Sequence, residues 1–145
     1  MIQISVKGLS EAVKAFERRG KLVKGGTQTA LRQALIDIQR DIWTGFDESR
    51  QVGGSTWRAL SPRYAAWKRK HGYSSRPNIR TGALRQYWSQ QVTGTRGVLR
   101  SSAVSRKGKP YAKHVHAVRP IVPTDERILA RARAAFERVL KMALQ

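Results

Sequence analysis

The sequence predicts an α+β fold: a small antiparallel sheet with a long N-terminal helical segment and a C-terminal helix packed on it. Helical spacing of apolar residues occurs in the first third of the chain and again at its C-terminal end. A period-two alternation opens the chain, and two strand-like runs joined by a glycine-containing turn lie between the helices. With 145 residues, of which 40% are hydrophobic, the chain fits a single domain spanning residues 1–145.

The first expected element is a short strand. Ile2, Ile4 and Val6 alternate with polar residues, which indicates a half-buried strand that ends at Gly8. Ser10 is suited to be the N-cap of a helical segment that follows, because its hydroxyl can accept a bond from a free N–H group of the first turn. Glycines interrupt that segment before residue 27.

A stronger helical pattern runs from about Thr27 to Trp43. Its apolar residues recur at offsets of four, three and four: Leu31, Leu35, Ile38 and Ile42. Phe46 continues the stripe, and Asp47–Thr56, rich in Gly and Ser, is expected to be a flexible loop. A short helix is then predicted to start at Ser61-Pro62, because proline at the first helical position loses no hydrogen bond.

Two strands are predicted at Arg85–Thr93 and Val98–Val104, joined as a hairpin by Gly94–Gly97. A further strand is predicted at Tyr111–Val118, after a basic turn. The last helix is expected to begin after Thr124 as its N-cap. Its apolar face comprises Ile128, Leu129, Ala132, Phe136, Val139, Leu140 and Ala143.

Charge is distributed unevenly along the chain. There are 29 Lys and Arg against 9 Asp and Glu, which gives a formal net charge of +20. No acidic residue lies between Glu48 and Asp125, so the middle of the chain carries one sign of charge. Such a block indicates nearby nucleic-acid phosphates or acidic protein surfaces, although an ordinary solvated basic surface is the alternative. The candidates for contact with DNA are Arg96, Arg100, Arg106, Lys107, Lys109 and Lys113.

Several classes of protein are excluded or left without support. The absence of cysteine excludes disulfides, zinc ribbons and thiol catalysis. No apolar run is long enough to span a membrane, and the opening residues lack a secretory apolar core, so a soluble protein is expected. Asp37 with Asp41, and His114 with His116, are weak candidates for metal ligands, because no third ligand is predicted beside either pair. No nucleophile elbow or phosphate-binding glycine loop is present, so we expect a non-enzymatic protein without a cofactor.

Aromatic residues are interleaved with the basic ones: Trp57, Tyr64, Trp67, Tyr73, Tyr87, Trp88 and Tyr111. Proteins that bind single-stranded nucleic acid stack bases on such residues. Trp and Tyr on short amphipathic elements more often build cores and interfaces, and that interpretation is favoured.

A succession of motifs carries a family resemblance. In order, the residues are Phe46, Gly54–Ser61 (GSTWRALS), Tyr64, Lys68 and Ile79–Leu84 (IRTGAL), followed by Pro110-Tyr111-Ala112, His114, His116 and Arg119-Pro120-Ile121. This succession resembles the phage virion-morphogenesis, or tail-completion, family, in which G-x-x-W-x-x-L-S, an aromatic residue with Lys, and T-G-x-L recur in this order. The chain departs from the pattern after His116, where Ala117-Val118 stand in place of an aromatic residue and Gly.

The resemblance implies a structural bacteriophage protein, a tail-terminator-like neck subunit that completes the tail and joins it to the head. It also implies a homo-oligomeric ring, with a hexamer as the expected form, assembled in the host cytoplasm. The ring would contact neck, connector and tail-tube proteins, surround double-stranded DNA and lie away from membranes. Fold-maintaining residues are expected at Gly54, Trp57, Leu60, Thr81, Gly82 and Leu84. Candidate subunit-interface residues are Asp37, Asp41, Asp47, Glu48, Trp57, Tyr64 and Trp67, since a closed ring needs two complementary faces on each subunit.

Two other classes remain open. The basic hairpin and the sequence pI of 11.6 are also typical of a freestanding nucleic-acid-binding protein. A small basic nuclease-like toxin is a weaker alternative, since no convincing set of acidic and histidine residues accompanies the charge.

Overall fold

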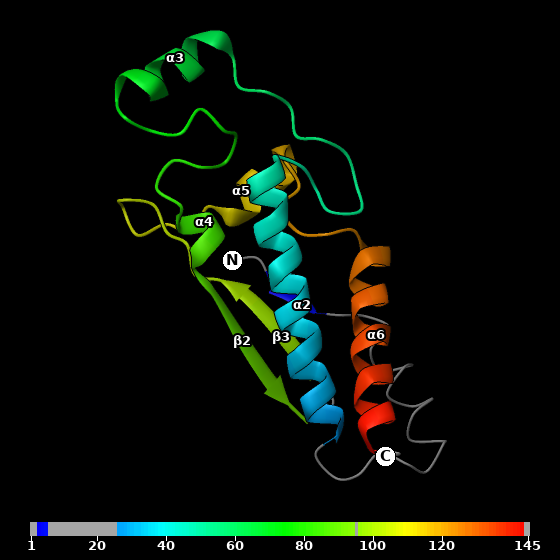
Figure 1. Cartoon of the computed structure of the whole chain (residues 1–145). Coiled ribbons are helices and arrows are strands. Elements are labelled where there is room, and N and C mark those ends of the chain that lie inside the picture. The colour runs from blue at the N-terminus through cyan, green and yellow to red at the C-terminus, as the bar shows by residue number, and fades with distance from the viewer. Residues whose placement is uncertain (1–2, 6–25, 95, 144–145) are drawn as a thin grey trace.

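The computed structural model describes residues 3–5, 26–94 and 96–143 (Figure 1). Its elements are, in chain order, β1 (Gln3–Ser5), α2 (Gly26–Glu48), α3 (Pro62–Lys70), α4 (Ala83–Gln86), β2 (Trp88–Thr93), β3 (Arg96–Ser101), α5 (Ala112–Val118) and α6 (Asp125–Ala143). A small antiparallel sheet, a long N-terminal helix and a C-terminal helix make up this α+β fold, which confirms the predicted fold class. The helical segment expected after Ser10 lies outside the described residues.

Helix α2 is the central element and lies between the hairpin and α6 (Figure 1). Its predicted apolar stripe is buried, and the helix runs five residues past the predicted end at Trp43, to Glu48. The extension follows from the sequence, because Gly45 and Phe46 keep to the same buried face. On the side of the hairpin, a Cβ added to Gly97 would lie 3.4 Å from Leu35 Cδ1, so the absence of a side chain there lets α2 rest close to β3.

Helix α6 lies along α2 with small residues at the junction. Ala30 and Ala34 of α2 and Ala132 and Ala135 of α6 are buried in one cluster around Phe136. Small side chains allow two helix backbones to approach closely. The start of α6 agrees with the prediction, since Thr124 Oγ1 accepts a hydrogen bond from Arg127 N at 3.4 Å.

The sheet has the strand order β1-β3-β2, with both pairings antiparallel. Ile4 lies opposite Leu99, and Leu99 lies opposite Gln90. The central strand β3 is mostly buried, whereas β2 is mostly exposed. The hairpin connection is tighter than predicted, because Thr93 already pairs with Arg96.

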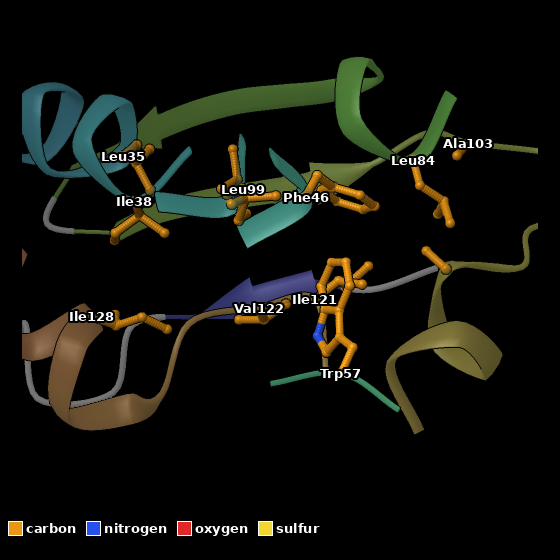
Figure 2. Close-up of a cluster of buried hydrophobic side chains, with 12 residues drawn as sticks. Leu35, Ile38, Phe46, Trp57, Leu84, Leu99, Ala103, Ile121, Val122 and Ile128 are labelled. Atoms are coloured by element: carbon orange, nitrogen blue, oxygen red, sulfur yellow. The ribbon is translucent and has the colours of Figure 1, made fainter. Parts of the chain in front are cut away.

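The main core forms where α2, β3 and the extended segment before α6 meet (Figure 2). Phe46 and Trp57 pack edge to face, with ring centroids 5.3 Å apart and an interplanar angle of 76°. Trp57 Nε1 donates to Pro120 O at 2.6 Å, so the tryptophan joins the loop after α2 to the segment that leads into α6. Ile121 and Val122 from that segment complete the cluster.

Three predicted segments differ from the structure. The predicted strand Arg85–Thr93 begins instead as helix α4, because Gly82 adopts φ 78° and its carbonyl accepts from Arg85 N and Gln86 N. The other predicted strand of the hairpin ends three residues early, at Ser101. The predicted strand Tyr111–Val118 is wrong: Ala112–Val118 form helix α5, and Ala112 and Val115, three residues apart, both pack on the core.

The expected flexible loop Asp47–Thr56 is also different in the structure. Helix α2 includes its first two residues, and Arg50 pairs with Thr56 in a short antiparallel bridge. Val52 is buried, and Gln51 Nε2 donates to Val122 O at 2.8 Å. The segment is therefore a turn that packs against the start of α6, and it makes more contacts with the rest of the fold than the prediction of a flexible loop implies.

Candidate functional site

Helix α3 stands out from the rest of the fold at the end of the molecule far from the C-terminus (Figure 1). It starts where the sequence predicts, with Ser61 Oγ accepting from Tyr64 N at 3.3 Å and Pro62 in the first turn. We call residues 61–82, which include α3 and the loop after it, the α3 arm. The arm has few apolar groups to bury, so its shape depends on specific polar contacts.

Lys68 supplies the central contact of the α3 arm. Its side chain is 2% exposed, and Nζ donates to Arg76 O at 2.8 Å and to Ile79 O at 2.6 Å. Burial lowers the pKa of Lys68, and the charges of Arg119 and Arg80 lower it further. The ammonium group thus fixes the returning loop against α3 through two backbone carbonyls, and these contacts are charge-assisted and stronger than neutral ones.

The aromatic residues of the α3 arm stack on one another. The ring of Trp67 stacks with Tyr64 at 5.8 Å, with His71 at 4.3 Å and with Tyr73 at 5.9 Å between centroids. The guanidinium of Arg80 lies 5.3 Å from the Trp67 ring and 5.1 Å from the Tyr73 ring. These cation–π and stacking contacts order the aromatic side chains of the arm, of which Tyr64 and Tyr73 also line a pocket.

A pocket of about 820 Å³ opens between the α3 arm, α4, the turn before α5, and α5 itself. All four tyrosines of the chain line it: Tyr64, Tyr73, Tyr87 and Tyr111. Five cationic side chains line it as well: Lys68, Arg80, Arg106, Lys107 and Arg119. No carboxylate is among the described residues of its wall, so the pocket has a positive potential and is suited to an anionic ligand.

The motif residues of the family resemblance meet at this pocket. Leu60, Thr81, Gly82 and Leu84 are part of its wall together with Lys68. Gly82 has the left-handed conformation that favours glycine, and it turns the chain from the arm into α4. Several motif residues that are spread over the chain therefore shape one pocket.

The two other fold-maintaining candidates act outside the pocket. Trp57 is 5% exposed and joins the loop after α2 to the segment that leads into α6, as described above. A Cβ on Gly54 would come within 2.4 Å of Gln51 Oε1, which would displace the side chain that bonds to Val122. The neighbouring Gly53 is a residue that the motifs missed: it has φ +80°, and a Cβ there would approach Thr124 Oγ1 to 2.5 Å.

The acidic side chains of α2 are bound within the chain. Asp41 is 3% exposed and accepts two bonds from Arg127, at 2.9 and 3.3 Å, and two from Arg131, at 2.9 and 2.6 Å. Burial alone would raise the pKa of Asp41, but the hydrogen bonds and charges of Arg131 and Arg127 outweigh it and hold the pKa below its ordinary value. Asp37 is 4% exposed and pairs with Arg138.

The assignment of Asp37 and Asp41 to an exposed subunit interface is therefore wrong, because both carboxylates join α2 to α6 inside the protein. Trp57 is likewise a core residue rather than a surface one. Asp47 and Glu48 are exposed and pair with Arg85 and Arg50.

Among the interface candidates, Tyr64 and Trp67 are exposed and uncharged, whereas the exposed Asp47 and Glu48 form ion pairs. They are 43% and 38% exposed, on the α3 arm. Exposed large aromatic side chains of this kind are typical of interface centres.

The six DNA candidates do not form one patch. Arg106 and Lys107 lie on the pocket wall, and Lys109 and Lys113 are exposed nearby in the same turn and in α5. Arg96 is at the start of β3 and Arg100 within it, so Arg96 lies a full strand away from the pocket, roughly 20 Å for six residues. The distance between Arg96 and the pocket could not be predicted from the charges of these residues or from their positions in the sequence.

The histidines do not share a face. His114 and His116 are two residues apart in helix α5, which turns their side chains in different directions. His116 Nδ1 accepts from Ile121 N at 3.1 Å, and burial lowers its pKa, so the neutral ring holds the segment before α6 in place. Within the described residues there is no group of three or more side chains of the types that bind metals.

Comparison with known protein families, curated proteins and solved structures finds no match for this chain. None of the helices in the described ranges combines the length and hydropathy needed to cross a bilayer.

Proposed function

We propose that the protein is a non-enzymatic structural subunit of a bacteriophage virion. In this proposal it forms a homo-oligomeric ring at the head–tail junction or the tail end, completes the tail, and lets DNA pass through the lumen. The family resemblance suggests this role. The observation that carries it is the α3 arm, an ordered projection with an aromatic surface and a basic pocket behind it.

The α3 arm supports assembly for a physical reason. Tyr64 and Trp67 are stacked and held in position before any partner arrives, so binding costs little conformational entropy. The carboxylates of α2 are paired within the chain, which leaves cations in excess on the surface. A closed ring of such subunits becomes favourable when the cations surround a polyanion or meet acidic neighbours.

Negative-stain microscopy and sedimentation of the purified protein test this proposal. Rings are expected, and Trp67→Ser with Tyr64→Ser should abolish them. The matched control is Met142→Ser with Val118→Ser, which removes exposed apolar side chains that belong neither to the arm nor to the pocket wall, and it should leave rings intact. A protein that stays monomeric with and without DNA would contradict the proposal, as would rings that survive the arm variant.

The alternative function is a freestanding nucleic-acid-binding protein, favoured by the net charge of +20. It requires tight binding to naked DNA by a monomer or dimer, with affinity falling steeply as salt rises. Titration of duplex DNA at several salt concentrations, together with sedimentation, separates the two functions. Tight binding without rings would favour the alternative.

A further inference from the structure

We propose that the pocket behind the α3 arm binds an acidic segment of a different polypeptide, one that carries apolar side chains next to its carboxylates. The pocket volume of about 820 Å³ is within the range of sites that bury most of a small ligand. That volume holds a few side chains of an extended segment rather than a folded surface.

The wall of the pocket has two chemical parts. Arg80, Arg106 and Lys107 are exposed cations that can pair with carboxylates. Aliphatic side chains, Leu60, Ile79, Leu84, Val104 and Val115, line it too. Tyr87, which is 56% exposed, and Tyr111 offer both a ring face and a hydroxyl. A ligand that satisfies the whole wall must therefore combine negative charge with apolar groups.

A second copy of this chain does not supply such a segment. Its acidic residues never exceed two in a row, and the pairs Asp47-Glu48 and Asp125-Glu126 are each followed within two residues by an arginine. Asp47 and Glu48 are already paired with arginines of their own chain. Charge complementarity therefore points to another protein.

Nucleic acid fits the pocket less well. Trp67 does not line the pocket, and its ring already contacts His71, Tyr73 and Arg80, so it does not provide a stacking platform for bases inside the pocket. Two of the three donors of Lys68 Nζ are used by backbone carbonyls, which removes most of its capacity to bind phosphate. Duplex DNA is stiff over this length, so its backbone does not bend into a pocket.

Binding of an acidic segment does not depend on ring formation. If no rings form, the proposal of peptide binding is unaffected. If the peptide does not bind, the proposal of a ring is unaffected. Under the proposed function, the partner would be another virion protein with an acidic tail or loop.

The test uses the full-length protein and fluorescence anisotropy with three labelled probes. The first is a short peptide of Glu, Leu and Phe; the second has Gln in place of Glu; the third is oligo(dT) of similar length. The pocket variant is Arg106→Ala with Lys107→Ala. The matched control is Arg69→Ala with Lys70→Ala, which removes the same charges from exposed positions of α3 that do not line the pocket.

The acidic peptide is expected to bind more tightly than the other two probes. The pocket variant should weaken it by about fivefold or more, and the control variant by less than about twofold. Val104→Ser, at an exposed position of the wall, should weaken it as well. Three outcomes would overturn the proposal: equal losses in the two double variants, no measurable binding of the acidic peptide, or tighter binding of oligo(dT) that depends on Arg106 and Lys107.

Discussion

The substitution Asp41→Asn should destabilise the protein far more than Asp47→Asn. Both aspartates are on α2, both accept two bonds from at least one arginine, and each substitution removes one negative charge. They differ in burial: the side chain of Asp41 is 4% exposed and that of Asp47 is 53% exposed. Asp41 also has two arginine partners and Asp47 one, so the pair of variants compares a buried, doubly paired carboxylate with an exposed, singly paired one.

The magnitude follows from the surroundings of Asp41. Removing one partner of a buried ion pair costs about 3–5 kcal/mol. Here the side chains of Arg127 and Arg131 are 39% and 33% exposed, so they regain part of their hydration once the carboxylate is gone. The asparagine carbonyl also keeps one acceptor, so a loss of about 2–3 kcal/mol is expected. The exposed pair of Asp47 should contribute less than about 1 kcal/mol.

Thermal unfolding followed by circular dichroism measures the difference. An unfolding entropy of about 2.1 cal/mol/K per residue gives roughly 0.3 kcal/mol/K for a chain of this length. The expected losses correspond to a fall in Tm of about 7–10 °C for Asp41→Asn and less than about 3 °C for Asp47→Asn. Equal shifts for the two variants, or a Tm for Asp41→Asn within about 1 °C of the parent, would refute the reasoning.

Two further predictions concern the segments that hold the pocket in place. The pKa of His116 is lowered by burial, so its stabilising contribution is complete above the ordinary histidine pKa and is lost as pH falls below it. His116→Asn keeps an acceptor for the N–H groups of residues 121–122, so it should reduce the fall in Tm between pH 7 and about pH 5. The control His114→Asn should leave that fall unchanged. An unchanged fall in Tm for His116→Asn would contradict the prediction. Lys68→Met should speed amide hydrogen exchange in the α3 arm by about tenfold, because two charge-assisted bonds to backbone carbonyls are lost. Exchange in α2 and α6 should change little, and Lys70→Met, at an exposed position, should leave the arm as protected as in the parent.

The sequence was sufficient for the elements whose signals are local. The stripe from Leu31 to Phe46 and the cap at Thr124 depend on spacing and on one hydroxyl, and both are present in the structure. Helix α5 was not predictable in the same way. The run from Tyr111 to Val118 is compatible with the two-residue period of a strand and with the period of a helix. It is helical because Ala112 and Val115 pack on the core from one face of the helix. That contact depends on segments far away in the chain.

The candidate site, like the fold, could be predicted from the sequence only in part. The motifs identified residues that matter for the pocket, such as Lys68 and Gly82. Gly82 was identifiable because glycine favours a tight turn, and Lys68 because it follows Tyr64 in the order of the motifs. Burial of the acids was not visible. Asp37 and Asp41 resemble an exposed acidic pair until α6 lies alongside α2 and brings its arginines to them, 86 to 101 residues further along the chain.

The burial of these acids has a consequence for the charge of the surface. Asp37 and Asp41 join two helices inside the fold, and their two negative charges balance two of the three positive charges of Arg127, Arg131 and Arg138. The unpaired cations then concentrate in the acid-free stretch between residues 48 and 125, which includes the α3 arm and the turn at Arg106. Mutual repulsion there is relieved by salt or by a polyanion, so the protein should gain stability when salt is added at low concentration, although its exposed pair at Asp47 is weakened. A Tm that falls steadily with added salt would show that attractive surface pairs, and not repulsion between cations, dominate the electrostatic energy of this fold.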